Sequence, residues 1–241
     1  MTGARGVAVG AVVVSGPLDL DGVEVIVGER QILSPMSLSF PPAEVTAVSG
    51  PSGSGKTTLL SVAGGLVRPT RGVSTYGGEP MWTGSGDPRP VVSFVLQVYG
   101  LVPILSAREN VAVALRARGV GPVPADNRAD AELQRLLIGD LGDRQVEELS
   151  GGQMQRVACA RALAVDAAIL LADEPTSELD EGSRELVMRE LHAEAAKGAV
   201  VVVATHDPAV VAAADRHYVL DEGRLTDHIA PVGPGYGRFA R

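Results

Sequence analysis

Apolar residues along this chain gather into short runs, and stretches of helical periodicity separate those runs. The runs that we interpret as strands are residues 7–14, 44–48, 91–96, 168–172 and 200–204. Short continuous apolar runs are typical of strands buried on both faces of a parallel sheet. Their alternation with helices therefore predicts an α/β core whose sheet is mostly parallel.

Between about residues 106 and 164 the apolar spacing becomes that of a helix, as Val111 and Leu115 illustrate. We expect an inserted helical subdomain there. Inside it, residues 118–126 (RGVGPVPAD) predict a surface loop between two helices, because glycine and proline interrupt regular structure. Residues 231–241, which are rich in the same two residues, predict a loose tail.

These patterns predict one domain with three parts. With 241 residues and 45% hydrophobic content, the chain is large enough for one α/β core with a modest insertion. The predicted parts are an α/β core of residues 1–97 and 165–228, a helical subdomain of residues 98–164 and a flexible tail of residues 229–241.

Composition and charge narrow the setting of the protein. No apolar run approaches the roughly 20 residues that cross a bilayer, and residues 1–15 are too weakly hydrophobic for a signal peptide, so we expect a cytoplasmic chain. A single cysteine, Cys159, excludes an internal disulfide framework and a cysteine-rich zinc site. The net charge of -8 argues against a nucleic-acid partner, which would need a basic face.

The stretch GPSGSGKTT directly after the predicted strand 44–48 matches the phosphate-binding loop G-x-x-x-x-G-K-[ST]. Its glycines allow backbone N–H groups to surround phosphates, and the helix that follows points its positive end at them. We expect Lys56 to reach the β- and γ-phosphates of a bound triphosphate and Thr57 to ligate Mg²⁺. A glycine-rich turn could match by chance, but the flanking strand and helix weaken that alternative. The expected nucleotide-binding residues are Gly50, Pro51, Ser52, Gly53, Ser54, Gly55, Lys56, Thr57 and Thr58.

Two acids, Asp173 and Glu174, come directly after the predicted strand 168–172. In parallel sheets ligands bind at the carboxyl ends of the strands. We expect Asp173 to hold Mg²⁺ through water and Glu174 to act as general base on the attacking water. Such a pair alone would more often be the favourable acids of a helix N-terminus. Together with the phosphate loop, it favours nucleotide hydrolysis.

A third motif, LSGGQ, ends at Gln153 and is followed by MQRVACARAL. Ser150 is typical of a helix N-cap, and Gly151 and Gly152 allow the backbone to come close to a phosphate, although a plain helix cap would have the same residues. With this motif the sequence resembles the ABC (ATP-binding-cassette) ATPases over nearly its whole length. The resemblance implies a P-loop NTPase (RecA-like) core, an antiparallel N-terminal β part and an inserted α-helical subdomain that carries the signature.

The resemblance also gives roles to residues whose type alone is uninformative. Gln97 matches the Q-loop, residues 177–180 (SELD) match the D-loop, and His206 matches the switch histidine that stabilises charge on the γ-phosphate. In this family two copies stack head to tail, and each ATP lies between one phosphate loop and the partner's signature, here Ser150, Gly151, Gly152 and Gln153. The implied catalytic residues are Lys56, Gln97, Glu174 and His206, and the implied metal ligands are Thr57, Gln97 and Asp173.

Two positions depart from the family's pattern. An aromatic residue usually stacks on adenine about where Val27 stands, so we expect weaker nucleotide binding or poorer selectivity for adenine. Glu178 in the D-loop stands where a small residue is common, and it adds a negative charge near the expected dimer interface.

The stretches QVYGLVPILSARENV and LADEPTSELD most resemble the subfamily that serves lipoprotein release, macrolide or peptide export, and cell division. That resemblance implies a separate integral-membrane permease, a place on the inner face of the cell membrane, and export or extraction as the direction. The apolar segment Tyr99, Leu101, Val102, Pro103 and Ile104 either receives a coupling helix of the permease or packs the helical core.

Three alternatives compete with this interpretation. An ABC ATPase without a permease, of the kind that serves cofactor assembly, fits the same motifs. A kinase or GTPase with a phosphate loop would leave LSGGQ and His206 unexplained. A cassette that binds ATP without hydrolysing it is disfavoured, because all four expected residues are present: Lys56, Asp173, Glu174 and His206.

Overall fold

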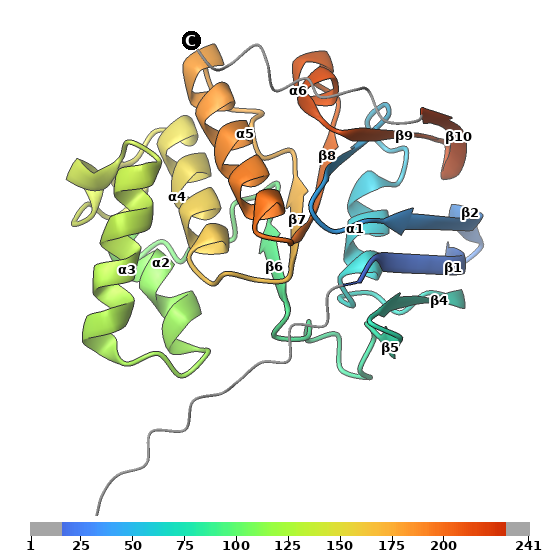
Figure 1. The fold of residues 1–241 in the computed structure, drawn as a ribbon, viewed down its shortest axis with the longest axis horizontal. Helices are drawn as coiled ribbons and strands as arrows, with labels where there is room; N and C mark the ends of the chain where they lie inside the picture. The colour runs from blue at the N-terminus through green and yellow to red at the C-terminus, as the bar shows by residue number, and fades with distance from the viewer. Residues whose placement is uncertain (1–15, 230–241) are drawn as a thin grey trace, which may run out of the picture.

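The computed structural model describes residues 16–229, which form two sheets and a layer of helices (Figure 1). The predicted strand of residues 7–14 lies outside the described residues. So does nearly all of the predicted tail, except that its first residue, Ile229, ends strand β10.

The central sheet has six strands in the order β10-β9-β3-β8-β7-β6. All neighbours pair in parallel except the edge strand β10, which runs antiparallel to β9. The predicted strands inside the described residues are confirmed, and their ends agree within one residue. The strands of this sheet are β3 Val45–Ser49, β6 Val92–Val95, β7 Ile169–Asp173, β8 Val200–Thr205, β9 Arg216–Asp221 and β10 Arg224–Ile229.

A second sheet, of four antiparallel strands, confirms the expected antiparallel β part. Its strand order is β2-β1-β4-β5, and the pairing of β1 with β2 shifts register at several points. The strands are β1 Leu18–Val27, β2 Arg30–Phe40, β4 Arg71–Tyr76 and β5 Glu79–Pro80.

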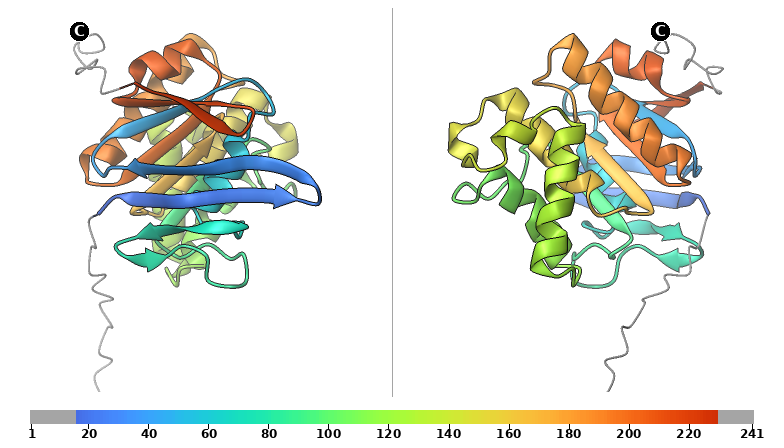
Figure 2. Two further views of the ribbon diagram at one scale, coloured as in Figure 1. Left: turned by 90° about the vertical axis from the view of Figure 1, so that its right-hand side faces the viewer. Right: turned by 60° about the vertical axis from the view of Figure 1, so that its left-hand side comes forward.

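The helices fall into two groups on the two faces of the central sheet. α1 lies between the two sheets. The opposite face of the central sheet is covered by α5 and by the helical layer, which consists of α2, α3 and α4 (Figure 2). The helices are α1 Lys56–Ala63, α2 Ala107–Arg116, α3 Pro122–Arg135, α4 Gly151–Leu163, α5 Glu181–Ala196 and α6 Pro208–Ala213, with short 3-10 turns at η1 Gly139–Leu141 and η2 Val146–Glu148.

Alternate residues of the central strands feed two separate hydrophobic cores. In β8, Val201 and Val203 pack with the helical layer, whereas Val200, Val202 and Ala204 pack with α1 and the antiparallel sheet. All of these side chains are fully buried. This explains the unbroken valine run, because a strand that is covered on both faces has no polar side.

The predicted surface loop of residues 118–126 is wrong in its second half. α3 begins at Pro122, and Gly121 is its N-cap in an extended conformation. Proline is well tolerated in the first turn of a helix, since the N–H that it lacks has no intrahelical partner there. The loop between α2 and α3 is therefore confined to residues 117–121.

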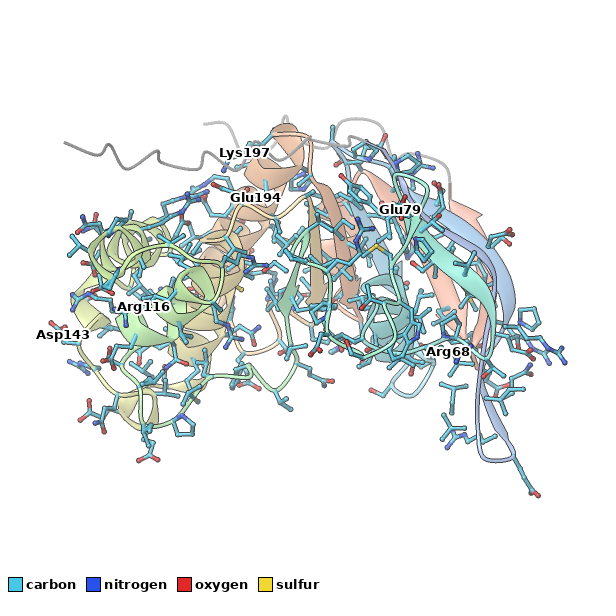
Figure 3. All side chains as sticks on the ribbon, turned by 90° about the horizontal axis from the view of Figure 1, so that it is seen from below. Arg68, Glu79, Arg116, Asp143, Glu194 and Lys197 are labelled. Carbon is cyan, nitrogen blue, oxygen red and sulfur yellow. The ribbon has the colours of Figure 1, made fainter. Side chains whose placement is uncertain are left out.

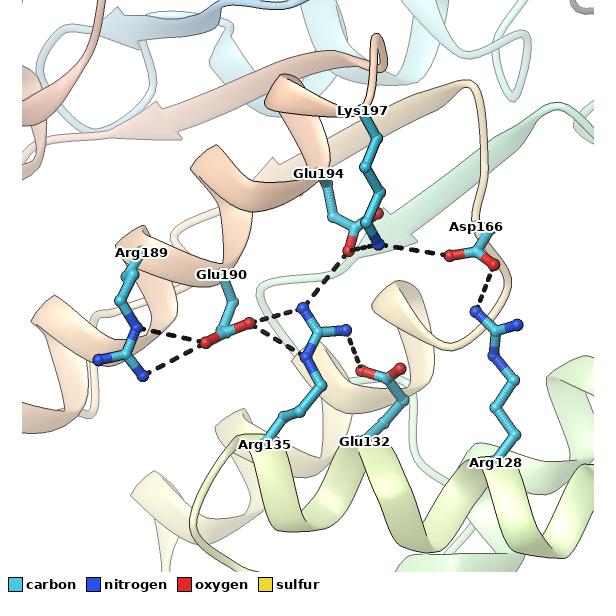
Figure 4. A network of polar contacts seen from close by, with 8 residues as sticks. All are labelled: Arg128, Glu132, Arg135, Asp166, Arg189, Glu190, Glu194 and Lys197. Atoms are coloured by element: carbon cyan, nitrogen blue, oxygen red, sulfur yellow. Dashed lines mark hydrogen bonds and ion pairs between the residues drawn. The ribbon is translucent and has the colours of Figure 1, made fainter.

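Ion pairs join the helical layer to the core helix α5. Arg135, at the end of α3, contacts Glu132 on its own helix and Glu190 and Glu194 on α5 (Figure 4). Lys197 pairs with Glu194 and also with Asp166. Other charged side chains spread over the surface, with Arg68 and Glu79 on the side of the sheets and Arg116 and Asp143 on the helical side (Figure 3).

Candidate functional site

The carboxyl ends of three neighbouring parallel strands bring the predicted site residues to one edge of the central sheet. β3 ends at Ser49 and leads into the phosphate loop, β7 ends at Asp173, and β8 ends at Thr205 directly before His206. Ser49 pairs with Thr205, and Asp173 pairs with Ala204. Segments that are far apart in the sequence therefore meet at this edge.

The phosphate loop is bridged by its own lysine. Lys56 Nζ donates to the carbonyl oxygens of Gly50, at 2.7 Å, and Pro51, at 3.1 Å. Gly50 has a φ of 150°, and a Cβ there would lie 1.9 Å from the carbonyl oxygen of Leu220 in β9, so only glycine fits. The loop thus packs directly against the neighbouring strand.

The loop fits the phosphates of a nucleotide in two respects. α1 begins after Gly55 without a side-chain cap, so the N–H groups of its first turn are available to an anion. Ser54 Oγ is buried and has no hydrogen-bond partner in the described part of the chain. A buried hydroxyl without a hydrogen-bond partner is destabilising, and a phosphate oxygen in the loop would accept a hydrogen bond from Ser54 Oγ. Pro51, Ser52 and Gly53 are exposed on the loop, and Thr58 is half-buried on α1.

Thr57 and Asp173 place two oxygen atoms that could ligate a metal ion next to each other. Thr57 Oγ1 donates to Asp173 Oδ2 at 2.5 Å. Burial raises the pKa of Asp173, and the Glu174 charge adds to that, while the Thr57 hydrogen bond and the Lys56 charge act in the opposite direction. One hydroxyl and one carboxylate are the few protein ligands that Mg²⁺ accepts alongside phosphate oxygens and water, so the residues present fit this ion.

Glu174 is held in an unusual backbone conformation. Its φ is 50°, in the left-handed region that non-glycine residues rarely adopt. His206 Nδ1 lies 2.7 Å from Glu174 Oε1, and the Thr205 hydroxyl donates to Glu174 Oε2 at 3.3 Å. The Glu174 side chain is 9% exposed, whereas that of His206 is 66% exposed. The pair therefore presents an imidazole to solvent and orients a buried carboxylate behind it.

The signature residues lie apart from this edge. Ser150 is the N-cap of α4, and its hydroxyl accepts from the backbone N–H of Gln153, whose side chain accepts from the N–H of Ser150. The expected N-cap is therefore present. α4 belongs to the helical layer, and α1 lies on the other face of the sheet (Figure 1). Within residues 16–229 no hydrogen bond or ion pair joins the signature to the phosphate loop.

Within the described residues, no hydrogen bond connects Gln97 to the other candidate site residues. Gln97 follows β6, its side chain is exposed, and it makes no hydrogen bond within the described residues. The structure thus brings together Lys56, Thr57, Asp173, Glu174 and His206, and it leaves Gln97 and the signature outside that group.

Three contacts at or near the site were not predicted from the sequence. Thr205 buttresses Glu174, as described above. Ser49 Oγ lies 2.6 Å from His217 Nε2, and burial lowers the pKa of that histidine. On α4, Arg161 donates to the carbonyl oxygens of Tyr99, at 2.6 Å, and Gly100, which fastens the segment after Gln97 to the signature helix. The sequence does not reveal these contacts, because each joins residues that are distant along the chain.

Comparison with known protein families identifies the family to which this combination of motifs belongs. The family described as ABC transporter matches residues 33–177, more than half of the chain. The chain belongs to the ABC transporter family. The matched span contains the phosphate loop, Gln97, the signature and the two acids. His206 lies beyond it, so its part in this ABC cassette rests on its contact with Glu174.

Relatives of this cassette come from more than one kind of transporter. The taurine import ATP-binding protein TauB of Mesorhizobium japonicum is 44% identical over 195 residues, covering 80% of this chain and 69% of TauB. The macrolide export ATP-binding/permease protein MacB of Wolinella succinogenes is 37% identical over 207 residues, covering 84% of this chain and 32% of MacB. The chain spans 61% of the length of an uncharacterized ABC transporter ATP-binding protein of Mycobacterium tuberculosis, Rv2564, to which it is 43% identical.

A solved structure confirms the predicted fold class. The ATP-binding cassette MJ0796 superposes with a TM-score of 0.83 at 31% identity, covering 88% of this chain and 98% of that one. MJ0796 was captured as a dimer in a post-hydrolysis state with ADP and Pi. Within residues 16–229 of the present chain, every helix is too short or too polar to traverse a bilayer.

Proposed function

We propose that this ABC cassette binds and hydrolyses ATP and thereby drives a separate membrane permease. One observation carries the proposal: the Thr57–Asp173 pair and the Glu174–His206 pair stand side by side at the mouth of the phosphate loop. Hydrolysis of a phosphoanhydride requires one place for a metal ion and another for an activated water.

Each residue of the site has a distinct task in this proposal. The Gly50–Thr58 loop binds the phosphates through backbone N–H groups, and Lys56 exchanges the carbonyl oxygens of Gly50 and Pro51 for β- and γ-phosphate oxygens. Glu174 accepts a proton from the attacking water. His206 stabilises the charge that develops on the γ-phosphate, and the Thr205 hydroxyl keeps the Glu174 carboxylate in place.

Thr57 and Asp173 are the residues that would hold Mg²⁺, with Gln97 as a further ligand. Mg²⁺ neutralises charge on the β- and γ-phosphate oxygens when it is bound. Gln97 is exposed and unattached in the described part of the chain, so it is free to join the site from the segment after β6.

The proposed active unit is a dimer of two copies. The signature residues Ser150, Gly151, Gly152 and Gln153 do not reach their own phosphate loop, so their predicted contact with ATP requires a second chain. The dimeric MJ0796 cassette, which held ADP and Pi, supports this arrangement. Hydrolysis is therefore expected to depend on association.

A small apolar surface after β6 is the proposed permease contact. Val98 and Ile104 are 81% and 77% exposed, and Val102 is partly exposed. Tyr99 and Leu101 instead pack against the helical core. The segment thus serves both alternatives considered above, since its exposed members are free for a coupling helix and its other members anchor it. The proposed site and this surface support a position on the inner face of the membrane, beneath the permease.

Export or extraction is the proposed direction, although the relatives point both ways. The resemblance of the segment after Gln97 to export systems supports it, as does the likeness to MacB. The likeness to TauB, which is named for taurine import, argues for uptake. The permease determines the direction and the substrate, so identifying it decides between them.

The direct test is a comparison of Glu174→Gln with the parent chain. We expect the parent to hydrolyse MgATP, and the variant to lose hydrolysis by about a hundredfold or more while it still binds ATP. Glu79→Gln, which removes the same charge from an exposed position on β5, should behave as the parent. Hydrolysis by the Glu174→Gln variant at the parental rate would overturn the assignment of the general base.

Affinity purification of the same variant from native membranes with MgATP tests the coupling to transport. Stoichiometric recovery of a multi-pass permease would support the transporter function and narrow the substrate. Recovery of only peripheral and cytosolic proteins from intact membranes would favour an assembly-type ATPase without a permease.

A further inference from the structure

The Glu178 carboxylate lies against the N-terminus of the signature helix. A Cβ built at Gly151 would lie 3.3 Å from Glu178 Oε2. At Gly152 a Cβ would lie 2.8 Å from the Glu178 carbonyl oxygen, so the backbone of residues 177–180 and α4 are in direct contact. Glu178 itself is exposed. The backbone contact therefore brings this acid beside the first turn of α4 from a different segment of the chain.

Tyr99 completes this cluster from a third segment. Its hydroxyl would lie 3.6 Å from the same Cβ at Gly151. Burial raises the pKa of Tyr99, and the Glu178 charge raises it further, which is the effect expected of an uncompensated negative charge close by. Arg161 holds the Tyr99 backbone in place from α4. The three segments thus meet at Gly151.

No positive side chain within residues 16–229 forms an ion pair with Glu178. In the part of the chain that the structure describes, its carboxylate forms no ion pair and no hydrogen bond. The nearest favourable field is that of α4, whose N-terminal N–H groups carry partial positive charge. The capping box satisfies the N–H groups of Ser150 and Gln153, whereas those of Gly151 and Gly152 have no hydrogen-bond partner within residues 16–229. The first turn of α4 therefore has a single unneutralised carboxylate next to an anion-binding surface.

We propose that Glu178 is an electrostatic gate on dimer formation. Its negative charge offsets part of the positive electrostatic potential at the N-terminus of α4. It also repels the phosphates that a second copy of the chain would bring to Ser150 and Gly151. This inference rests on the proposed function, in which those phosphates belong to the partner's ATP. Glu178 thereby raises the ATP concentration at which two copies associate, and it leaves nucleotide binding to each separate chain unchanged.

The test measures association of the full-length chain in a background that hydrolyses ATP slowly. Sedimentation velocity of the Glu174→Gln protein, with Glu178→Gln, Glu178→Asp or Glu79→Gln added, would be followed over a series of MgATP concentrations. Glu178→Gln should lower the ATP concentration for half-maximal dimer by roughly three- to tenfold at low salt. Glu178→Asp keeps the negative charge, and Glu79→Gln removes a distant one. Both variants should therefore reach half-maximal dimer at nearly the same ATP concentration as the background protein.

Two further readouts separate repulsion from a structural role. The difference between Glu178→Gln and its background should shrink as salt rises from about 0.05 to 0.5 M, because exposed charges are screened. ADP binding to the separate chains should not change.

Each outcome has a definite meaning. If Glu178→Gln needs the same or more ATP to associate than Glu79→Gln, the carboxylate does not oppose association and the gate is refuted. If the background protein binds ATP and never associates, the proposed dimer fails and the gate fails with it.

Discussion

Arg135 donates two hydrogen bonds to a single oxygen of Glu190, at 2.6 Å from Nη2 and 3.1 Å from Nε (Figure 4). Its Nη1 donates to Glu132 at 2.8 Å, and Nη2 is 3.5 Å from Glu194. The three carboxylates are nearly buried, and burial raises the pKa of Glu132 despite the arginine. One guanidinium thus bridges the three acids at the junction of α3 and α5, while Arg189 and Lys197 add positive charge at Glu190 and Glu194.

Replacing Arg135 by methionine should therefore destabilise the fold. The change leaves the nearly buried Glu132 and Glu190 without their main partner, and we expect a loss of about 2 kcal/mol in the free energy of unfolding, below the figure for a fully buried pair because Arg135 is partly exposed. Urea unfolding measures the loss. Arg189→Met is the matched control, since Arg189 contacts Glu190 from a mostly exposed position and should cost less than about 0.5 kcal/mol. Equal losses for both variants would contradict the role of Arg135.

His192 on α5 should make stability depend on pH. Burial lowers the pKa of His192 from 6.5, while the Asp215 carboxylate and the Ala213 carbonyl act in the opposite direction. Because the folded state binds the proton less well than the unfolded state, this contribution is complete above about pH 6.5 and is lost as pH falls toward the lower folded pKa.

The variant His192→Gln should flatten that dependence. Glutamine can still donate to the Ala213 carbonyl, which His192 Nε2 contacts at 3.0 Å, but it does not titrate. Denaturant midpoints at pH 7.5 and pH 5.5 give the difference for each protein, and a constant cost of the substitution cancels in that difference. The prediction is wrong if both proteins lose the same stability between the two pH values.

The substitution Val27→Tyr should tighten ATP binding. Val27 is at the end of β1 and is 65% exposed, so a larger side chain has room there. Stacking of an aromatic ring on a base contributes about 1–3 kcal/mol, which corresponds to about fivefold or more in affinity. Ile26→Tyr, on the opposite face of the same strand, is the control for equilibrium binding. An unchanged affinity of Val27→Tyr would show that adenine does not lie at this position.

The exposed and the packed residues after β6 should respond differently to a charge. We expect Ile104→Asp to reduce stimulation of the ATPase by the co-purified permease and to leave basal hydrolysis intact, because its side chain is exposed. Leu101→Asp should lower both activities, since Leu101 packs against the helical core. Basal and permease-stimulated rates of the two variants measure this. If Ile104→Asp keeps full stimulation, the permease does not dock on this surface.

The parts of the fold that depend on local pattern could be predicted from the sequence. The valine-rich run 200–204 and the acid pair at the end of β7 need no tertiary information. The half-exposed strands β1 and β2 did, because their shifts in register blur the alternation of apolar and polar residues. The sequence predicts a loop at Pro122 where α3 begins, because a proline at the start of a helix looks the same in sequence as a proline in a loop.

The candidate site divides in the same way. Lys56, Thr57, Asp173 and Glu174 stand in motifs whose spacing to a strand fixes their position. The contact of Glu178 with Gly151 could not be predicted, because it depends on how residues 177–180 lie across a helix that begins far earlier in the chain. The free position of Gln97 is likewise a property of the segment that follows β6.

The bridge from Lys56 to the carbonyl oxygens of Gly50 and Pro51 affects how knockout variants should be interpreted. The same ammonium group that would bind phosphate also ties the first residues of the loop to the start of α1. Truncating Lys56 would therefore disorder the loop as well as remove a phosphate contact. A chain without Lys56 reports on loop order and on ligand affinity together, and it is a poor stand-in for a protein that only fails to bind ATP.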